Sequence, residues 1–162
     1  LVALGTGPGY YTGIRAGIAY GAALARALCV KAVPLSSLEL FVWDMRDEYE
    51  LLAPVFRART SHCYAALYKS RGGALNEIVA PCFIRVSELV EKLAAYPSAA
   101  IVSPDIEQYP ALAQCGCAVV PRESASGGAC AVMGGGRAAR AVAPELIRGT
   151  YLRAPDIGPT SL

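Results

Sequence analysis

The sequence predicts an α/β fold, and three observations support this prediction. Strand-like apolar segments alternate with segments of helical periodicity along the chain. The composition is 54% hydrophobic and 17% charged, far from that of a disordered chain. A length of 162 residues is sufficient for one domain, or for two small lobes, with a buried core.

The chain begins with a predicted strand and a helix. Residues 1–4 are apolar and are expected to form a short buried strand. Thr12 is a suitable N-cap for a helix that continues to about Leu28.

A second strand and a second helix follow. Residues 30–33 are apolar and β-branched, and Ser36 or Ser37 can cap a helix that reaches about Trp43. Residues 44–50 are rich in charge. They are expected to mark a boundary between two lobes.

The middle of the chain favours an antiparallel meander. Strands are predicted over residues 51–57, 63–68 and 78–84, with turns at residues 59–61 and 71–73.

Helices and strands then alternate again. Val86 is expected to open a helix capped by Ser87. Strands are predicted at residues 99–102 and 118–120, with a short helix or loop at residues 106–115 between them. Beyond them the chain is rich in alanine, and we predict one helix on each side of the glycine run that ends at residue 136.

Charge and hydropathy exclude several classes of function. The net charge of +2 does not by itself argue for nucleic-acid binding. A modest basic group near the end consists of Arg137, Arg140, Arg148 and Arg153. Of these, Arg137, Arg140 and Arg153 are expected to contact solvent rather than nucleic acid. No apolar segment is long enough to span a membrane, and the start shows no charged leader. A cytoplasmic protein without membrane contact is expected.

The chain offers little material for a metal or catalytic site. The single histidine, His62, cannot supply paired metal ligands or a second acid-base partner, and it is expected at the surface. Cys63 follows it on a predicted strand, so the two side chains would point to opposite faces. The six cysteines form no C-x-x-C pair and are expected to be buried free thiols, with a Cys115–Cys117 pair as the alternative. We predict no catalytic residue and no metal.

The segment GTGPGYYTG (Gly5–Gly13) has the glycine content of a phosphate-binding loop but matches neither known fingerprint. The dinucleotide pattern G-x-G-x-x-G requires glycine where Thr12 stands, and the Walker pattern requires a lysine that the segment lacks. Gly7, Pro8 and Gly9 are therefore expected to form a tight turn from strand to helix.

The helix after this turn carries a stripe of small residues. Gly13, Gly17, Gly21 and Ala25 recur every four residues. An interior glycine costs a helix roughly 0.5–1 kcal/mol relative to alanine, so a close contact is expected to compensate. That contact is either with another element of this chain or with a helix of a partner chain.

Three segments, in order, resemble the tRNA threonylcarbamoyladenosine biosynthesis protein TsaB (YeaZ) family. GTGPGYYTGIRAGIA (Gly5–Ala19) is similar to the family motif G-x-G-P-G-S-F-T-G-[LIV]-R-[IVA]-G. VPLSSLE (Val33–Glu39) resembles V-x-G-V-S-S-L-E, and TYLRAPDI (Thr150–Ile157) resembles P-x-Y-L-R-x-P-x-A.

The resemblance implies an actin-like, ribonuclease H-like α/β fold of two related lobes, as in sugar kinases, Hsp70 and actin, with the first strands and helix of the N-terminal lobe missing. Residues 1–50 would be the remainder of the N-terminal lobe and residues 51–125 the C-terminal lobe. Residues 126–162 would form a helical segment and tail that pack back on the lobes.

The implied function is that of a non-catalytic scaffold subunit in tRNA threonylcarbamoyladenosine modification. Its partners would be a TsaD-type paralogue, which is the catalyst, and a TsaE-type ATPase. A homodimer is expected in isolation, tRNA is expected to be reached only indirectly, and ATP or ADP only in complex with the partner. The helix after the glycine turn would then be the partner interface, and the expected interface residues are Thr12, Gly13, Arg15, Gly17, Tyr20, Gly21 and Leu24.

The chain also departs from the family pattern. The family segment D-A-R-x-G-E-V-Y corresponds here to RARTSHCY (Arg57–Tyr64), so Arg57 occupies the acidic position. The family's first strand, I-L-A-I-D-T-S, and its hairpin have no counterpart here, which favours a truncated or split, divergent member. The alternative function is a nucleotide-binding, kinase-like ATPase of the same fold, in which Ala129–Arg140 would form a strand, a glycine turn and a helix.

Overall fold

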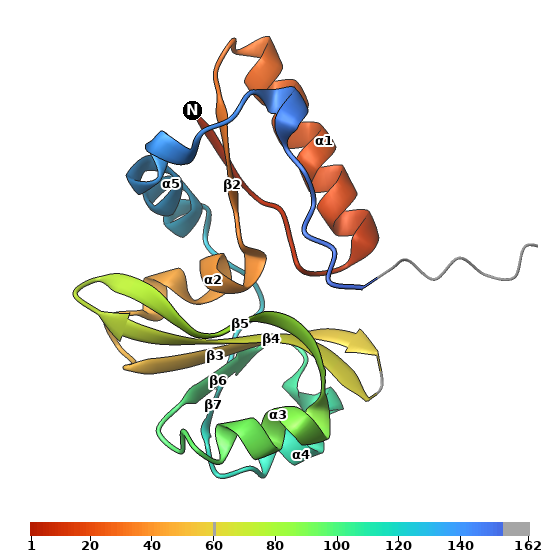
Figure 1. Cartoon of the computed structure of the whole chain (residues 1–162), viewed down its shortest axis with the longest axis vertical. Helices are drawn as coiled ribbons and strands as arrows, with labels where there is room; N and C mark the ends of the chain where they lie inside the picture. Colours follow the sequence, from red (N-terminus) through yellow and green to blue (C-terminus); the bar gives the residue numbers. More distant parts are fainter. Residues whose placement is uncertain (60, 154–162) are drawn as a thin grey trace, which may run out of the picture.

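The computed structural model describes residues 1–59 and 61–153, and it contains two β-sheets (Figure 1). A two-stranded sheet has the order β1-β2, and a five-stranded sheet has the order β5-β4-β3-β6-β7. In Figure 1 the small sheet and its helices form the upper part of the molecule, and the large sheet forms the lower part.

The small sheet lies between two helices. Its elements and the first of these helices are β1 (Val2–Gly5), α1 (Tyr11–Ala27) and β2 (Ala32–Leu35). The two strands are parallel, so side chains alternate between the two faces. Leu4 and Ala32 pack against α1, whereas Val33 and Leu35 pack with buried residues of the C-terminal helix α5 (Gly127–Gly136). This alternation is what buries both faces of a sheet of only two strands.

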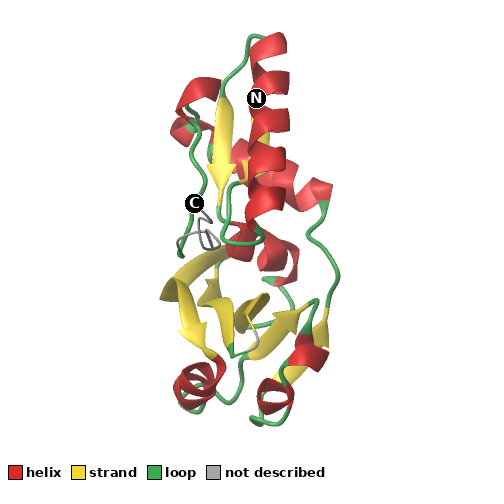
Figure 2. Ribbon diagram, turned by 90° about the vertical axis from the view of Figure 1, so that its right-hand side faces the viewer, coloured by secondary structure: helices red, strands yellow, loops and turns green. Residues whose placement is uncertain are grey.

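Helix α2 connects the two sheets and is buried along its length. The elements here are α2 (Ser37–Val42) and the 3-10 turn η1 (Trp43–Met45). The Ser36 side chain accepts a hydrogen bond from the backbone N–H of Glu39, which confirms Ser36 as the helix cap. Leu38 packs into the core on the large sheet, and Leu40 packs on α5. Figure 2, turned by 90°, shows α2 between the two sheets.

The large sheet combines an antiparallel meander with a parallel part. Its strands are β3 (Leu51–Arg59), β4 (His62–Arg71), β5 (Ala74–Arg85), β6 (Ala100–Ser103) and β7 (Ala118–Pro121). β3, β4 and β5 pair antiparallel, whereas β6 and β7 run parallel to β3. The β4–β5 turn has positive φ at Gly72 and Gly73, a conformation that favours glycine. The predicted meander and the two later strands are thereby confirmed.

The lower face of the large sheet is covered by short helices. They are α3 (Val86–Leu93), η2 (Ile106–Gln108) and α4 (Pro110–Ala113). Leu89, Leu93 and Leu112 pack with Ile101 of β6 in one buried cluster. The prediction that Ser87 caps α3 is wrong, because the helix begins at Val86 and Ser87 lies within it.

The C-terminal segment forms one α-helix and two short 3-10 turns, where two helices separated by the glycine run were predicted. Its elements are α5 (Gly127–Gly136), η3 (Ala138–Arg140) and η4 (Pro144–Leu146). The glycine run continues α5 because Gly134 lies against β1, where a Cβ would stand 2.3 Å from Cβ of Ala3. Ala129 to Gly136 are helical, so the strand expected within Ala129–Arg140 is not formed there. Residues 154–162, which end the predicted tail and the third family-like segment, lie outside the described residues.

The first strand has one sheet partner in the part of the chain that the structure describes. β1 pairs with β2 only, and β2 adds one antiparallel bridge from Ala32 to Val142. Helix α5 contacts β1 from the side opposite α1, and there the Cys130 thiol lies 3.4 Å from the carbonyl oxygen of Ala3. None of the described helices has the length and apolar character needed to cross a membrane.

The cysteines differ in exposure, which corrects the expectation that all are buried. Cys63 and Cys117 are buried, but Cys29 is exposed. It follows α1 with a φ of 53°, the left-handed conformation that commonly ends a helix. Burial raises the pKa of the Cys63 thiol to about 12, because the charged thiolate is disfavoured away from water.

Alkylation of the native chain is expected to separate these thiols. At neutral pH iodoacetamide should label Cys29 first, while Cys63 stays protonated and covered. Peptide mass spectrometry at successive times checks the order of labelling, and equal labelling of both thiols would contradict it.

Because burial raises the pKa of Cys63 above its ordinary value of 9.0, the stability that this neutral thiol contributes is complete below pH 9.0 and is lost as the pH rises towards 12.

Candidate functional site: the glycine turn and the open face of α1

The turn between β1 and α1 requires glycine at one position. Gly7 has a φ of 110°, and a Cβ there would lie 2.6 Å from the carbonyl oxygen of Thr150. Gly9 meets nothing within 4 Å and has an ordinary φ. Of the residues Gly7, Pro8 and Gly9, which lie between β1 and α1, only Gly7 is therefore required by both conformation and space.

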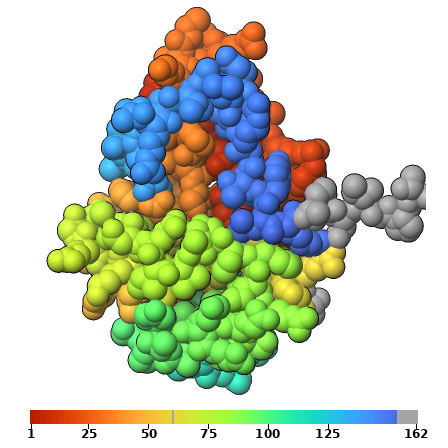
Figure 3. All heavy atoms as spheres, viewed as in Figure 1, coloured from red at the N-terminus to blue at the C-terminus, as the bar shows by residue number. Residues whose placement is uncertain are grey.

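Hydrogen bonds attach this turn to two other segments. The backbone N–H of Gly7 donates to Oγ of Ser37 at 2.9 Å, and the N–H of Ser37 donates to the Gly7 carbonyl at 2.8 Å. On the other side the N–H of Thr150 donates to the Thr6 carbonyl at 2.7 Å. The start of α1 is thus held by α2 and by the C-terminal segment, which Figure 3 shows running over the N-terminal part of the chain.

Helix α1 begins two residues earlier than predicted. The N-cap position is Tyr10, which has an extended backbone and provides no side-chain hydrogen bond. The prediction that Thr12 is the cap is wrong, since Thr12 lies in the first helical turn and is exposed.

The predicted glycine stripe divides between two environments. Gly13 and Gly17 meet nothing within 4 Å, whereas a Cβ on Gly21 would lie 2.9 Å from Cδ1 of Leu4. Ala25 is fully buried beneath the same helix. Residues four apart turn by about 400°, so each step shifts the stripe about 40° around the helix. The stripe therefore winds from the open side of α1 into the contact with β1.

The open face of α1 carries six exposed residues without charge. We define it by Gly13, Ala16, Gly17, Tyr20, Leu24 and Ala27, which are all exposed. The side chains of Tyr20 and Leu24 are 73% and 39% exposed, and these are large exposed fractions for apolar side chains. The four-residue glycine spacing does not indicate Ala16 and Ala27, because these residues follow the 3.6-residue helical period. Arg15 lies on another side of the helix, with its guanidinium 4.0 Å from the Tyr11 ring centre.

The basic residues near the end of the chain do not form one surface group. Arg137 pairs with the nearly buried Glu39, and Arg148 donates to the Glu145 carbonyl. Arg140 is exposed, and Arg153 lines a pocket beside the glycine turn. A separate ion pair, from Arg122 to Asp44, holds the pKa of that carboxyl below its usual range through a side-chain hydrogen bond.

His62 is half-buried and is occupied by local contacts. Its ring stacks on Phe83 with 4.8 Å between ring centres, and Nδ1 lies 2.9 Å from Oγ of Ser61. Across residues 1–59 and 61–153, no three His, Cys, Asp or Glu side chains gather as a metal site would require.

The architecture described above is that of the actin-like, ribonuclease H-like class. YeaZ from Pseudomonas aeruginosa superposes with a TM-score of 0.78 and 21% identity, over 91% of this chain and 72% of that one. A second structure, described as an uncharacterized protein with similarity to peptidase YEAZ from the same organism, has a TM-score of 0.77 and 22% identity, over 92% of this chain and 71% of that one. These likenesses establish the fold.

A family model places the chain more narrowly. Residues 1–135 match the family described as TsaD, tRNA N6-adenosine threonylcarbamoyltransferase, and the chain belongs to this family. Within it the chain is a divergent TsaB/YeaZ-like member. It is 32% identical over 92 residues to the tRNA threonylcarbamoyladenosine biosynthesis protein TsaB of Bacillus subtilis strain 168. That match covers 57% of this chain and 40% of the relative, so the chain spans less than half of the curated protein.

Proposed function

We propose that this chain is a non-catalytic subunit of a tRNA threonylcarbamoyladenosine modification complex. Its task is to bind a TsaD-type paralogue, which carries the transferase chemistry, through the open face of α1. The family model and the TsaB relative support the pathway. The geometry of α1 supports the mode of binding.

The observation that carries this proposal is the uncompensated cost of two glycines. Gly13 and Gly17 lie in a 17-residue helix and contact nothing within 4 Å at the place of a Cβ. Relative to alanine, Gly17 in the helix interior costs about 0.5–1 kcal/mol, and Gly13, in the first helical turn, adds less. Gly21 offsets its cost by close contact with Leu4, but the other two have no such contact within the described chain. A helix from another protein can approach closely at these positions.

The same face can serve more than one protein. A second copy of this chain can occupy it when the paralogue is absent, which gives a homodimer in isolation. A TsaE-type ATPase would join the assembled pair, and ATP or ADP would bind only in that complex. In this arrangement the paralogue is the subunit that holds the tRNA where the transferase reaction takes place.

Two substitutions on the open face test the proposal. Gly17→Leu adds bulk where nothing lies within 4 Å, and Tyr20→Asp places a charge on a side chain that is 73% exposed. Both variants should fold, and each is expected to weaken binding to a purified TsaD-type protein about tenfold or more, a loss of about 1.4 kcal/mol. Titration calorimetry measures the change.

A matched control uses another exposed apolar residue. Val132 of α5 is 65% exposed, and Val132→Asp should change the dissociation constant less than about twofold. Equal effects of all three substitutions would exclude the open face as the interface. Micromolar binding of ATP by the isolated chain would instead favour the nucleotide-binding enzyme.

A further inference from the structure

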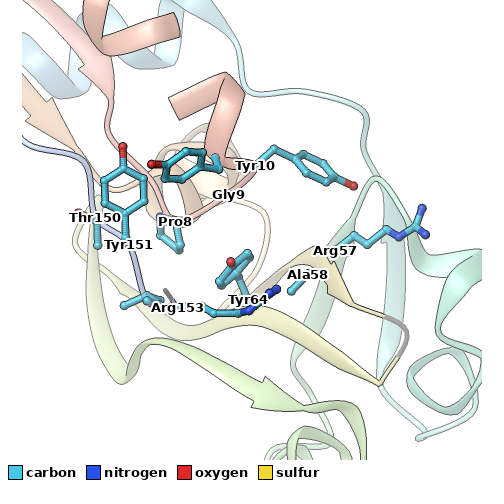
Figure 4. A pocket seen from close by; sticks show the side chains of 11 residues that line it. Pro8, Gly9, Tyr10, Arg57, Ala58, Tyr64, Thr150, Tyr151 and Arg153 are labelled. Carbon is cyan, nitrogen blue, oxygen red and sulfur yellow. The ribbon is translucent and has the colours of Figure 1, made fainter. Parts of the chain in front are cut away.

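A pocket of about 300 Å³ lies where the two parts of the molecule meet (Figure 4). Its walls come from the glycine turn, from strands β3 and β4, and from the C-terminal segment. The residues that the argument uses are Tyr10, Tyr11, Arg57, Tyr64, Tyr151 and Arg153. Figure 4 shows Tyr151 on one side, Arg57 on the other, and Tyr64 with Arg153 below the turn.

Four tyrosines give the pocket aromatic surfaces and hydroxyl groups. The rings of Tyr11 and Tyr151 lie 5.2 Å apart at 48°, while Tyr10 is 62% exposed and Tyr151 43% exposed. Tyr64 contacts Phe83 at 5.7 Å between ring centres, which fixes its position. Exposed tyrosine faces stack well on flat aromatic groups such as nucleobases.

The charge of the pocket is positive. Arg57 and Arg153 line it, and no acidic side chain does so among the described residues. Arg57 is exposed and forms no ion pair in the described part of the chain. The acidic Asp105 and Glu123 line a neighbouring hollow that shares Arg57 and Tyr10. A phosphate would therefore bind on the Arg57 side that faces the tyrosines.

The walls are held in place before any ligand arrives. The Tyr109 hydroxyl donates to the His62 carbonyl at 2.7 Å and accepts from the N–H of Ala58 at 3.4 Å, so it joins the ends of β3 and β4. The bonds from Gly7 to Ser37 fix the turn opposite. A backbone that is already fixed on both sides of the pocket lowers the entropy lost on binding.

We propose that this pocket binds an unpaired nucleotide of an RNA strand, with its base on the tyrosine faces and its phosphate on Arg57. The exposed rings of Tyr10 and Tyr151 provide a stacking surface, and the glycine turn lacks the pattern that cradles the phosphates of a free nucleotide. Arg57 is central, because it is an exposed cation that lines the pocket and has no ion-pair partner in the described part of the chain. This adds a direct RNA contact that is independent of the partner interface on α1.

Fluorescence anisotropy with the full chain tests the assignment. The probe is a fluorescein-labelled, unstructured oligoribonucleotide of about twelve nucleotides, within the range that single-strand sites cover. Arg57→Asp is expected to weaken binding about tenfold or more and to reduce the slope of log K against log salt by about 0.7. Tyr64→Ala should weaken binding about fivefold or more through lost stacking. The matched control Arg71→Asp makes the same charge change at the distant β4–β5 turn and should alter affinity less than about threefold.

A competition experiment distinguishes an RNA strand from a free nucleotide, since both offer a base and a phosphate. AMP is expected to displace the RNA only at millimolar concentration, because it offers one base and one phosphate. Displacement at micromolar AMP would overturn the RNA assignment in favour of a free nucleotide. Unchanged affinity in Arg57→Asp, or equal losses in Arg57→Asp and Arg71→Asp, would exclude the pocket. Because the chain is tested alone, these outcomes leave the partner proposal unaffected.

Discussion

Replacing Arg137 by alanine is expected to lower the free energy of unfolding by about 3 kcal/mol. The Glu39 side chain is only 9% exposed, and both its carboxylate oxygens accept hydrogen bonds from the Arg137 guanidinium. Removal of the arginine leaves a carboxylate with little access to water and without its partner. Because Glu39 lies on α2, which joins the two sheets, the loss also weakens the connection from α2 to the end of α5.

A double variant distinguishes charge from packing. Glu39→Gln combined with Arg137→Ala removes the uncompensated charge, so it should be more stable than Arg137→Ala alone. Urea unfolding followed by circular dichroism provides both values. A loss below about 1 kcal/mol in the single variant would show that the pair behaves as a surface ion pair and would contradict this expectation.

Gly134→Val is expected to destabilise the chain by about 2–3 kcal/mol, because β1 occupies the space of the new side chain. A Cβ at this position would lie 2.3 Å from Cβ of Ala3 and 3.6 Å from its Cα, and backbone cannot move aside as a flexible side chain can. Thermal unfolding monitored by circular dichroism measures the loss.

The neighbouring glycine is the matched control. Gly135 meets nothing within 4 Å, so Gly135→Ala should stabilise α5 by about 0.5–1 kcal/mol through helix propensity alone. The two substitutions lie one residue apart in the same helix and should change stability in opposite directions. Destabilisation of similar size in both would mean that the glycine run, rather than contact with Ala3, determines the stability of α5.

The order of most elements could be predicted because local patterns and tertiary contacts agree. Strand-like segments alternate with turns in residues 51–85, and they form the antiparallel meander. Ser36 caps α2 at the point where two serines are followed by apolar residues. The glycine run at residues 134–136 predicts a break in the helix. This prediction is wrong, because the close approach of α5 to Ala3 depends on a residue more than 120 positions away. Propensity alone cannot reveal such a contact.

The candidate site was predictable in part for a similar reason. The four-residue spacing of Gly13, Gly17 and Gly21 locates the helix that carries small residues. It cannot show that Gly21 faces Leu4 while Gly17 faces outward, because this depends on how α1 is rotated on the sheet. The pocket beside Arg57 combines three segments distant in sequence, so no local pattern indicated it.

The exposure of α1 to solvent and to a partner can be measured directly by hydrogen exchange. Deuterium uptake is compared for the chain alone and for the chain saturated with a TsaD-type protein, with peptides covering α1 (Tyr11–Ala27) and α5 (Gly127–Gly136). The proposed interface predicts slower exchange in α1 on binding, with little change in α5. Unchanged exchange in α1 together with protection in α5 would contradict a partner surface on the open face of α1.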